Sequence, residues 1–499
     1  MPALSVIDLA MFLLETPERP FNIGPLIVLD PPERGRKTFA DRLVKRMLER
    51  PVGPPFSYRL RMPLVGVPSL EPDPKADAST QVHRRTLPAP GSFEQLAAEV
   101  CELHAERLDR SRLLWELYVF DGLEGGKVAI YGKAHHGIID GKGFVMAVSN
   151  WLAPTGDGPE VHALWEGLPK RPGGGARASM ARRLVGAFGQ ARGTAGSALG
   201  LYRMLAEHAL KALLPGASDA MALPFAGIPK VLAGKSSAQR SFAYCTLPIA
   251  EMKALGKAHG ATLNDLLLAT VGLALDAYLK EQGLKPLKAL VAAMPVALAD
   301  AKGGNQIAVL QFPIGATGQA PRERLNAIRA ETAKVKGVVQ KVATDTVMLY
   351  TTVVHGLPAL IEKAGFKRGL PVCNLMVSNP FGLPEKRYLM GAKVEVVLPI
   401  SVVAAGQMLN VTAVTLDDRL QLGFLAMPHI VPHIDRLARH TVEAFETLKA
   451  ALQAAPAAAA PAKKQPAARR PARTAGAKIV QRKPAVRKAA GRARGAAPA

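Results

Sequence analysis

Strand-like and helical segments alternate through both halves of this chain, and their order is the feature that most limits its fold. Residues 21–30 and 127–134 are apolar and strand-like, whereas residues 39–48 and 262–280 repeat apolar side chains at helical spacing. With 48% hydrophobic and 21% charged residues, the composition is that of a globular protein. The order therefore predicts an α/β (α+β) protein, and the composition excludes collagen-like, coiled-coil and wholly disordered chains.

Shifts in composition divide the chain. Gly and Pro become frequent over residues 153–176, an Arg-rich helical stretch follows over residues 177–214, and a new series of strands begins near residue 240. From residue 453 onward, Ala, Pro, Lys and Arg dominate, and such a segment buries too little apolar surface to fold. We therefore predict an N-terminal domain, a helical linker, a C-terminal domain and a disordered tail, over residues 1–165, 166–239, 240–452 and 453–499.

Positive charge is concentrated in the tail. The residues from Lys463 to the end hold 12 Lys and Arg and no Asp or Glu, which is half of the net charge of +24. Three interpretations of the tail stay open: a solubilising extension, binding to an anionic membrane or lipid-inclusion surface, and binding to nucleic acid. The Arg-rich stretch 177–214 is interpreted either as a linking helix lying on the protein or as a membrane-surface helix.

Cysteine usage and hydropathy indicate the compartment. Cys101, Cys245 and Cys373 are far apart and form no CxxC pair, which is typical of a reducing compartment and of a protein without a cysteine-based metal or redox site. The first fifteen residues lack a basic segment before their apolar run, and no uncharged apolar stretch reaches 18 residues. We therefore expect no signal peptide, no transmembrane helix and a cytoplasmic location.

The sequence HHGIIDG, residues 135–141, directly follows the second strand of a predicted hairpin. Side chains alternate along a strand, so His135 and His136 are expected to point to opposite faces of the sheet. Two rings that diverge in this way do not share one metal ion, and no other metal-binding pattern lies nearby. We therefore predict no metal site here.

The same heptad also contains a carboxylate, Asp140, which the turn is expected to bring close to the end of the strand. Asp140 follows His136 by four residues, and Gly137 and Gly141 allow the backbone a tight path between them. A histidine at a strand end, held by a turn that carries a carboxylate, is suited to act as a general base. The alternative interpretation is a structural histidine in the core.

The heptad HHGIIDG resembles the HHxxxDG signature of the bacterial wax ester synthase/diacylglycerol acyltransferase family, which belongs to the CoA-dependent acyltransferases with the chloramphenicol acetyltransferase fold. Further segments are similar to this family in the same order along the chain: residues 5–30, 82–96, 108–141, 260–279, 294–309 and 377–394. The resemblance implies two chloramphenicol acetyltransferase-like domains with mixed sheets and a channel between them.

The resemblance also implies the chemistry. The family transfers a fatty acyl group from acyl-CoA to diacylglycerol or a long-chain alcohol, and acyl-CoA is a substrate rather than a cofactor, so no cofactor is expected. His136 is implied as the general base, Asp140 as the residue that orders the turn, and His135 as a residue that shapes the channel. The candidates for stabilising the oxyanion or positioning substrate are Asn264, Ser378 and Asn379. The alternatives are a hydrogen bond at a helix N-terminus for Asn264 and a turn role for the other two. The expected location extends to the periphery of the inner membrane or of lipid inclusions.

Two observations keep a second function open. Ala299 stands where related acyltransferases carry an Arg that pairs with the Asp of the signature, and the tail is strongly basic. These observations favour a non-catalytic lipid-inclusion or nucleoid-associated protein with a decayed acyltransferase site.

Overall fold

In the computed structural model of this protein, the described residues are 4, 6–63, 68–158, 162–168, 225, 227–297, 307–339, 342, 344–366, 370–379 and 382–454. Several predictions concern residues outside these ranges: most of the linker 166–239 with its Arg-rich stretch, Ala299, and the tail beyond residue 454. The described residues up to 453 belong to one compact unit.

The first of two six-stranded sheets in the described residues is built mainly from the N-terminal half and has the order β11-β12-β1-β6-β5-β4. Its strands are β1 (Asn22–Asp30), β4 (Val82–Thr86), β5 (Trp115–Asp121), β6 (Val128–His135), β11 (Tyr388–Leu389) and β12 (Ala392–Ile400). The helices of this half are α1 (Val6–Leu14), α2 (Phe39–Leu48), α3 (Phe93–Ala105) and α4 (Gly141–Trp151). A separate two-stranded sheet pairs β2 (Tyr58–Arg61) with β3 (Ser69–Pro72). The hairpin predicted around residues 116–134 is confirmed as β5 and β6, which pair antiparallel.

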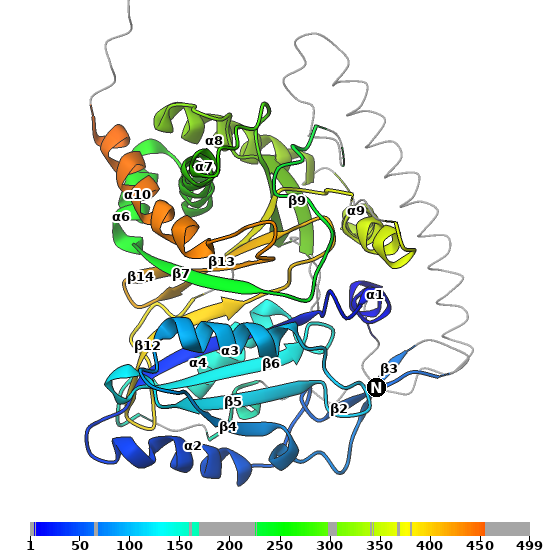
Figure 1. Cartoon of the computed structure of the whole chain (residues 1–499), viewed down its shortest axis with the longest axis vertical. Coiled ribbons are helices and arrows are strands. Elements are labelled where there is room, and N and C mark those ends of the chain that lie inside the picture. Colours follow the sequence, from blue (N-terminus) through cyan, green and yellow to red (C-terminus); the bar gives the residue numbers. More distant parts are fainter. Residues whose placement is uncertain are drawn as a thin grey trace, which may run out of the picture. The chain divides into compact units, whose positions relative to one another are not determined.

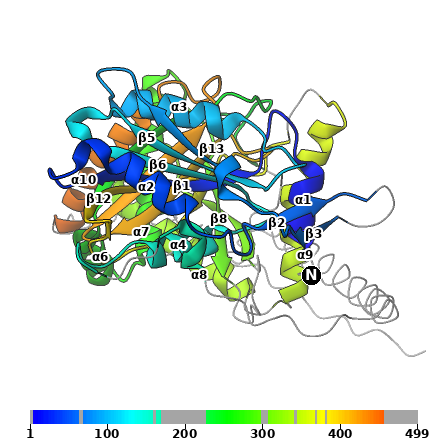
Figure 2. The same ribbon diagram turned by 90° about the horizontal axis from the view of Figure 1, so that it is seen from below.

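The second sheet has the order β7-β14-β13-β10-β8-β9 and includes parallel and antiparallel pairs. Its strands are β7 (Ser241–Pro248), β8 (Val291–Ala297), β9 (Ile307–Pro313), β10 (Leu375–Ser378), β13 (Leu409–Leu416) and β14 (Arg419–Ala426). The helices of this half are α6 (Ile249–His259), α7 (Leu263–Glu281), α8 (Pro321–Val339), α9 (Thr344–Lys363) and α10 (Ile434–Gln453). Figure 1 shows α6, α7, α8 and α10 over this sheet and the first sheet beneath it, and Figure 2 shows the same elements from below. The predicted α/β fold with mixed sheets is confirmed.

Two strands from the C-terminal half of the sequence, β11 and β12, lie in the first sheet. β12, from the C-terminal half of the sequence, pairs antiparallel with β1 of the N-terminal half, with Gly24 opposite Ile400 and Asp30 opposite Lys393. The sequence predicts the strand at 393–400 but groups it with residues 240–452, whereas the structure places it in the first sheet. An apolar strand pattern reports which residues are buried but not which distant strand is the hydrogen-bonding partner.

A local signal in the sequence explains where α3 begins. Ser92 and Gln95 form a capping box at the start of α3: the Ser92 N–H donates to Gln95 Oε1 over 2.8 Å, and the Gln95 N–H donates to Ser92 Oγ. Cys101 lies on the buried face of α3, as the helical spacing of the apolar residues around it indicates. Burial raises the pKa of the Cys101 thiol to about 12, so the residue is a core side chain and not a thiolate nucleophile.

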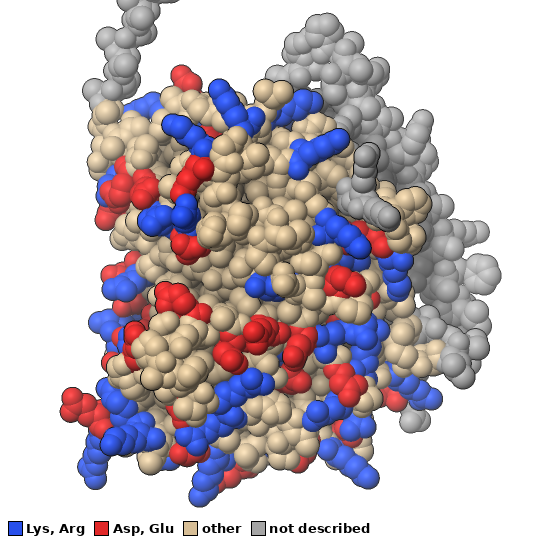
Figure 3. Space-filling model, in the orientation of Figure 1, with Lys and Arg blue, Asp and Glu red and all other residues tan. Residues whose placement is uncertain are grey.

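The core of the second half surrounds α7, most of whose side chains are buried. No single described helix is long and apolar enough to cross a membrane, although α6 and α7 taken together meet the length and composition criteria as a pair bent by 106°. Figure 3 shows acidic and basic side chains interspersed over the visible face of the described part. Ion pairs such as Arg84 with Asp41 illustrate this mixing.

Candidate active site

The two histidines stand where β6 ends, in the middle of the first sheet. The His135 N–H donates to the Leu114 carbonyl over 2.9 Å, and the His136 N–H donates to the Phe21 carbonyl over 2.7 Å, so the neighbouring chain segments hold both backbones. The rings diverge as the strand alternation predicts: His136 lines a large cavity, and His135 is not among the lining residues. The two rings therefore serve different environments.

His135 is packed into the protein core. Its ring stacks on Phe12 of α1 with centroids 4.1 Å apart, and its Nδ1 accepts a hydrogen bond from the Gly137 N–H over 3.0 Å. Burial lowers the pKa of His135 well below its ordinary value, and the nearby Arg110 cation acts in the same direction. A neutral ring whose Nδ1 accepts a hydrogen bond carries its proton on Nε2. His135 thus fixes the start of the turn after β6.

The buried carboxylate of Glu15 helps to position His136 through the backbone of Phe21. Glu15 Oε1 accepts a hydrogen bond from the Phe21 N–H over 3.1 Å, and Glu15 Oε2 receives the Arg110 guanidinium over 2.8 Å. Phe21 in turn provides the carbonyl that holds the His136 N–H. The Arg110–Glu15 pair therefore positions His136 through one backbone residue.

His136 presents one ring nitrogen to the cavity. Its Nδ1 is buried and has no hydrogen-bond partner among the described residues, which leaves Nε2 as the accessible nitrogen. Burial lowers the pKa of His136, while its own backbone carbonyl and the carboxylates of Asp140 and Asp8 oppose this shift. The ring is therefore neutral near pH 7, as a proton acceptor must be.

Asp140 is the N-cap residue of α4. Its Oδ1 accepts a hydrogen bond from the Gly143 N–H over 2.6 Å, which satisfies one of the free donors at the helix start. The carboxylate thus orders the turn between β6 and α4 and places a negative charge near His136.

The two glycine positions of the motif differ in whether the structure requires glycine there. A Cβ added to Gly137 would lie 2.6 Å from Phe12 Cε2 and 3.0 Å from His135 Nδ1, so only glycine fits there. A Cβ added to Gly141 would meet nothing within 4 Å, and the backbone there does not adopt a positive φ. Tight packing therefore requires glycine at position 137, whereas at position 141 neither packing nor backbone conformation requires it.

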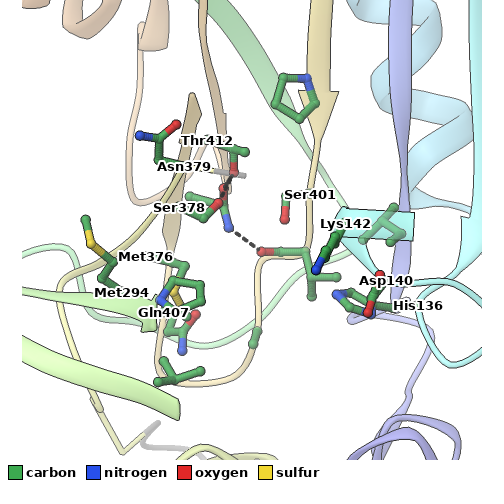
Figure 4. A pocket seen from close by; sticks show the side chains of 18 of the residues that line it. His136, Asp140, Lys142, Met294, Met376, Ser378, Asn379, Ser401, Gln407 and Thr412 are labelled. Atoms are coloured by element: carbon green, nitrogen blue, oxygen red, sulfur yellow. Dashed lines mark hydrogen bonds between the residues drawn. The ribbon is translucent and has the colours of Figure 1, made fainter. Parts of the chain in front are cut away.

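The cavity in front of His136 has a volume of about 610 Å³ and lies between the two halves. His136, Asp140 and Gly141 line it from the first half, and Asn264, Ser378 and Asn379 line it from the second, so six of the eight predicted site residues meet there. Figure 4 shows His136, Asp140 and Lys142 on one side and Ser378, Asn379 and Thr412 on the other. Most of the wall is apolar and includes Ile23, Phe144, Met294, Val309 and Val414.

Asn264 is not the cap of its helix. Thr262 and Asp265 form the capping box of α7, and the Asn264 Oδ1 instead accepts a hydrogen bond from Asn379 Nδ2 over 2.9 Å. This bond joins α7 to the end of β10 across the cavity wall. The Asn264 side-chain amide keeps its N–H donors for a ligand, because the described residues provide no acceptor for them.

Ser378 belongs to a chain of hydroxyl and amide groups. Thr412 Oγ1 donates to Asn410 Oδ1 over 2.7 Å, and Ser378 Oγ lies 2.7 Å from Thr412 Oγ1. Since an amide oxygen only accepts and Thr412 has one hydroxyl proton, Ser378 must donate to Thr412. Ser378 therefore presents lone pairs to the cavity, which suits the positioning of a hydroxyl group rather than the stabilisation of an oxyanion.

Sequence reasoning missed two walls of the cavity. α1 provides Ile7, Ala10, Met11 and Leu14, and its apolar sequence VIDLAMFLL was the available signal. α9 provides His355, whose Nδ1 accepts a hydrogen bond from Gln407 Nε2 over 3.0 Å. Burial lowers the pKa of His355 to about 4, so this ring is neutral as well. No local motif marks His355 in the sequence.

The described ranges contain no group of three or more His, Cys, Asp or Glu side chains placed to hold a metal ion.

Comparisons with known proteins identify the family. Residues 4–267 match the profile of the wax ester synthase/diacylglycerol acyltransferase catalytic domain, and residues 303–449 match the profile of the C-terminal domain that accompanies it. This chain belongs to the wax ester synthase/diacylglycerol acyltransferase family. The enzyme is accordingly an acyltransferase. A relative in Mycobacterium tuberculosis, Tgs4, is named a probable diacylglycerol O-acyltransferase and is 31% identical over 460 residues, which cover 90% of this chain and 97% of Tgs4.

Solved structures support the fold of this acyltransferase. The wax ester synthase/diacylglycerol acyltransferase from Marinobacter aquaeolei VT8 matches 91% of this chain and 100% of its own, with a TM-score of 0.68 and 22% identity. The first condensation domain of the calcium-dependent antibiotic synthetase matches 90% of this chain and 96% of its own, with a TM-score of 0.54 and 14% identity. Both comparisons support the expected chloramphenicol acetyltransferase-like fold.

Proposed function

We propose that this acyltransferase moves a fatty acyl group from acyl-CoA to the hydroxyl group of diacylglycerol or of a long-chain alcohol, with His136 as the general base. The observation that carries the proposal is the position of a neutral imidazole, with one nitrogen accessible, on the wall of a mostly apolar cavity. A cavity of this size and lining is typical of a site for an apolar ligand.

The proposed reaction needs one proton acceptor. His136 Nε2 takes the proton of the acceptor hydroxyl while its oxygen attacks the thioester carbonyl carbon, and a C–O bond forms. The tetrahedral intermediate then collapses, the C–S bond breaks, and the imidazolium returns the proton to the departing CoA thiolate. The Asn264 amide is the candidate donor to the oxyanion, and Ser378 and Asn379 are candidates for positioning substrate.

The alternative of a non-catalytic protein with a decayed site rests on Ala299 and the basic tail, neither of which lies in the described residues. The part of the site that the structure describes supports catalysis, because it contains His136, the Glu15–Arg110 ion pair that positions His136, and the helix cap formed by Asp140. Binding of the tail to a membrane, a lipid inclusion or nucleic acid, and the cytoplasmic location, stay predictions from the sequence.

The direct test is product formation by the full chain. Purified enzyme is incubated with palmitoyl-CoA and, separately, with dioleoylglycerol, hexadecanol and a short-chain alcohol, and the products are identified by mass spectrometry. We expect triacylglycerol or wax ester together with an equal amount of free CoA. CoA release without ester would point to water or another acceptor, and no CoA release with any alcohol would contradict the proposed function.

The pH dependence of the reaction tests the base separately. The pKa of free imidazole is about 6.5 and burial lowers that of His136, so kcat/KM should stay constant from pH 7 down to below pH 6.5 and fall only in more acidic buffer. Asp140→Asn keeps a good N-cap residue but removes a charge that favours the imidazolium, so the acid limb should move to still lower pH. A shift to higher pH in this variant would contradict the assignment of the base.

Folding must be monitored alongside this profile. Burial lowers the pKa of His104 to about 3, whereas the unfolded chain takes up this proton near pH 6.5. The unfolded state therefore binds more protons below pH 6.5, and stability falls as the pH decreases towards 3. Far-ultraviolet circular dichroism at each pH separates loss of catalysis from loss of fold.

A further inference from the structure

A second cavity adjoins the first at the start of α7. It is lined by the turn from Gly260 to Thr262 and by one face of α8, where Asn326, Arg329, Ala333 and Lys336 follow one another at helical spacing. Asp265, Thr332 and Lys336 line both cavities. The second cavity therefore continues from the reaction cavity towards Arg329.

The charge of the second cavity is unbalanced. Lys334, on the same helix, pairs with the Glu331 carboxylate over 2.8 Å. Arg329 and Lys336 have no carboxylate partner among the described residues. The only carboxylate lining this cavity is Asp265, whose oxygens accept hydrogen bonds from the Thr262 N–H, the Thr262 hydroxyl and the Thr332 hydroxyl. Two free cations thus face a cavity whose one anion is already bonded.

Arg329 reaches across the cavity. A Cβ built on Gly260, which has a φ of 59°, would lie 3.0 Å from Arg329 Nη2, so the guanidinium rests against the turn between α6 and α7. Arg329 and Lys336 are seven residues apart on α8, or about 10 Å along the helix axis. Lys336 lies nearer the reaction cavity because it lines both spaces.

We propose that the second cavity binds the phosphates of the CoA donor, with Lys336 at the pyrophosphate and Arg329 at the ribose 3′-phosphate. The inference rests on the proposed function, since it takes acyl-CoA as the donor. The order follows from the molecule: the thiol end reaches His136, the pyrophosphate is the first charged group behind the pantetheine arm, and the 3′-phosphate is the next. A guanidinium can hold a terminal phosphate through two parallel hydrogen bonds, and an ammonium serves as a point charge.

The test compares donors that are shortened stepwise from the nucleotide end, first by the 3′-phosphate and then by the whole nucleotide. KM is measured with palmitoyl-CoA, palmitoyl-dephospho-CoA and palmitoyl-pantetheine for the full chain and for Arg329→Gln, Lys336→Gln and the control Lys334→Gln. Arg329→Gln and Lys336→Gln should each raise KM for palmitoyl-CoA about tenfold with kcat retained. With the dephospho donor only Lys336→Gln should have an effect, and with the pantetheine donor neither should. Lys334→Gln should behave as the wild type throughout.

A binding measurement keeps the inference separate from catalysis. Titration calorimetry with CoA and with pantetheine should show about tenfold weaker CoA binding by the Arg329 and Lys336 variants and unchanged binding of pantetheine. Wild-type affinity for CoA in both variants would overturn the inference, as would an equal loss for pantetheine. A reversed pattern with dephospho-CoA would overturn the order of the two phosphates. If the binding result holds but no donor gives an ester, the proposed function fails while the CoA site stands.

Discussion

Replacing His136 with alanine should lower kcat for ester formation by about 10²–10⁴-fold, the usual contribution of a positioned general base. The ring is the one imidazole of the motif that reaches the cavity, and the backbone hydrogen bond of His136 to Phe21 is kept in the variant. The free energy of unfolding should change little, because the side chain lines a cavity and makes no side-chain hydrogen bond through Nδ1. Initial rates and urea unfolding of both proteins provide the comparison.

His135→Ala is the matched control for this prediction. It removes a ring that stacks on Phe12 and accepts the Gly137 N–H, so it should destabilise the protein more than His136→Ala does. Its kcat, measured under conditions where it is folded, should fall less than that of His136→Ala. The opposite order of the two kcat values would show that the base has been assigned to the wrong histidine.

Gly137→Ala should destabilise the protein by about 1–3 kcal/mol, the usual cost of forcing a methyl group into a packed core. The new Cβ would overlap the Phe12 ring and crowd His135 Nδ1, and the turn that places His136 would shift. Activity should therefore fall along with stability. Urea unfolding and initial rates at 25 °C measure the two effects.

Gly141→Ala adds the same methyl group at a position where it clashes with no protein atom. Its Cβ has no protein atom within 4 Å and the residue starts α4, where alanine is the better helix former, so stability should be unchanged or higher by up to about 1 kcal/mol. Gly141 lines the cavity, so any loss of activity in this variant would appear in KM for a bulky substrate rather than in folding. Equal destabilisation by both substitutions would contradict the difference in packing described here.

Local patterns predicted much of this site. Strand alternation separated His135 from His136, and the four-residue return of Asp140 predicted an ordered turn, which the structure explains as a helix cap. Ser92 and Gln95, three residues apart, likewise mark the start of α3 in the sequence. These features depend on neighbours in sequence, where spacing alone determines which side chains meet.

Contacts between distant segments could not be predicted in this way. The direction of the hydrogen bond from Ser378 depends on Thr412 and Asn410 of another strand. The support of His136 by Glu15 depends on Arg110, far along the chain. α1 was missed because it is apolar apart from Asp8: one face packs Phe12 on His135 while another lines the cavity, so no polar stripe marks it as a surface helix.

The crossing of β12 into the first sheet has a consequence for turnover. The walls of the reaction cavity come from both halves, yet β12 ties them together by its backbone pairing with β1, which runs from Gly24 to Asp30 with one register shift between Val28 and Leu29. A rigid-body movement that separated the N-terminal half of the sequence from the C-terminal half would have to break those hydrogen bonds. No ligand contact offsets this cost before the ligand has entered the cavity. Loading of donor and release of ester are therefore expected to occur through local displacement of helices and side chains at the rim, while the framework stays closed throughout the cycle.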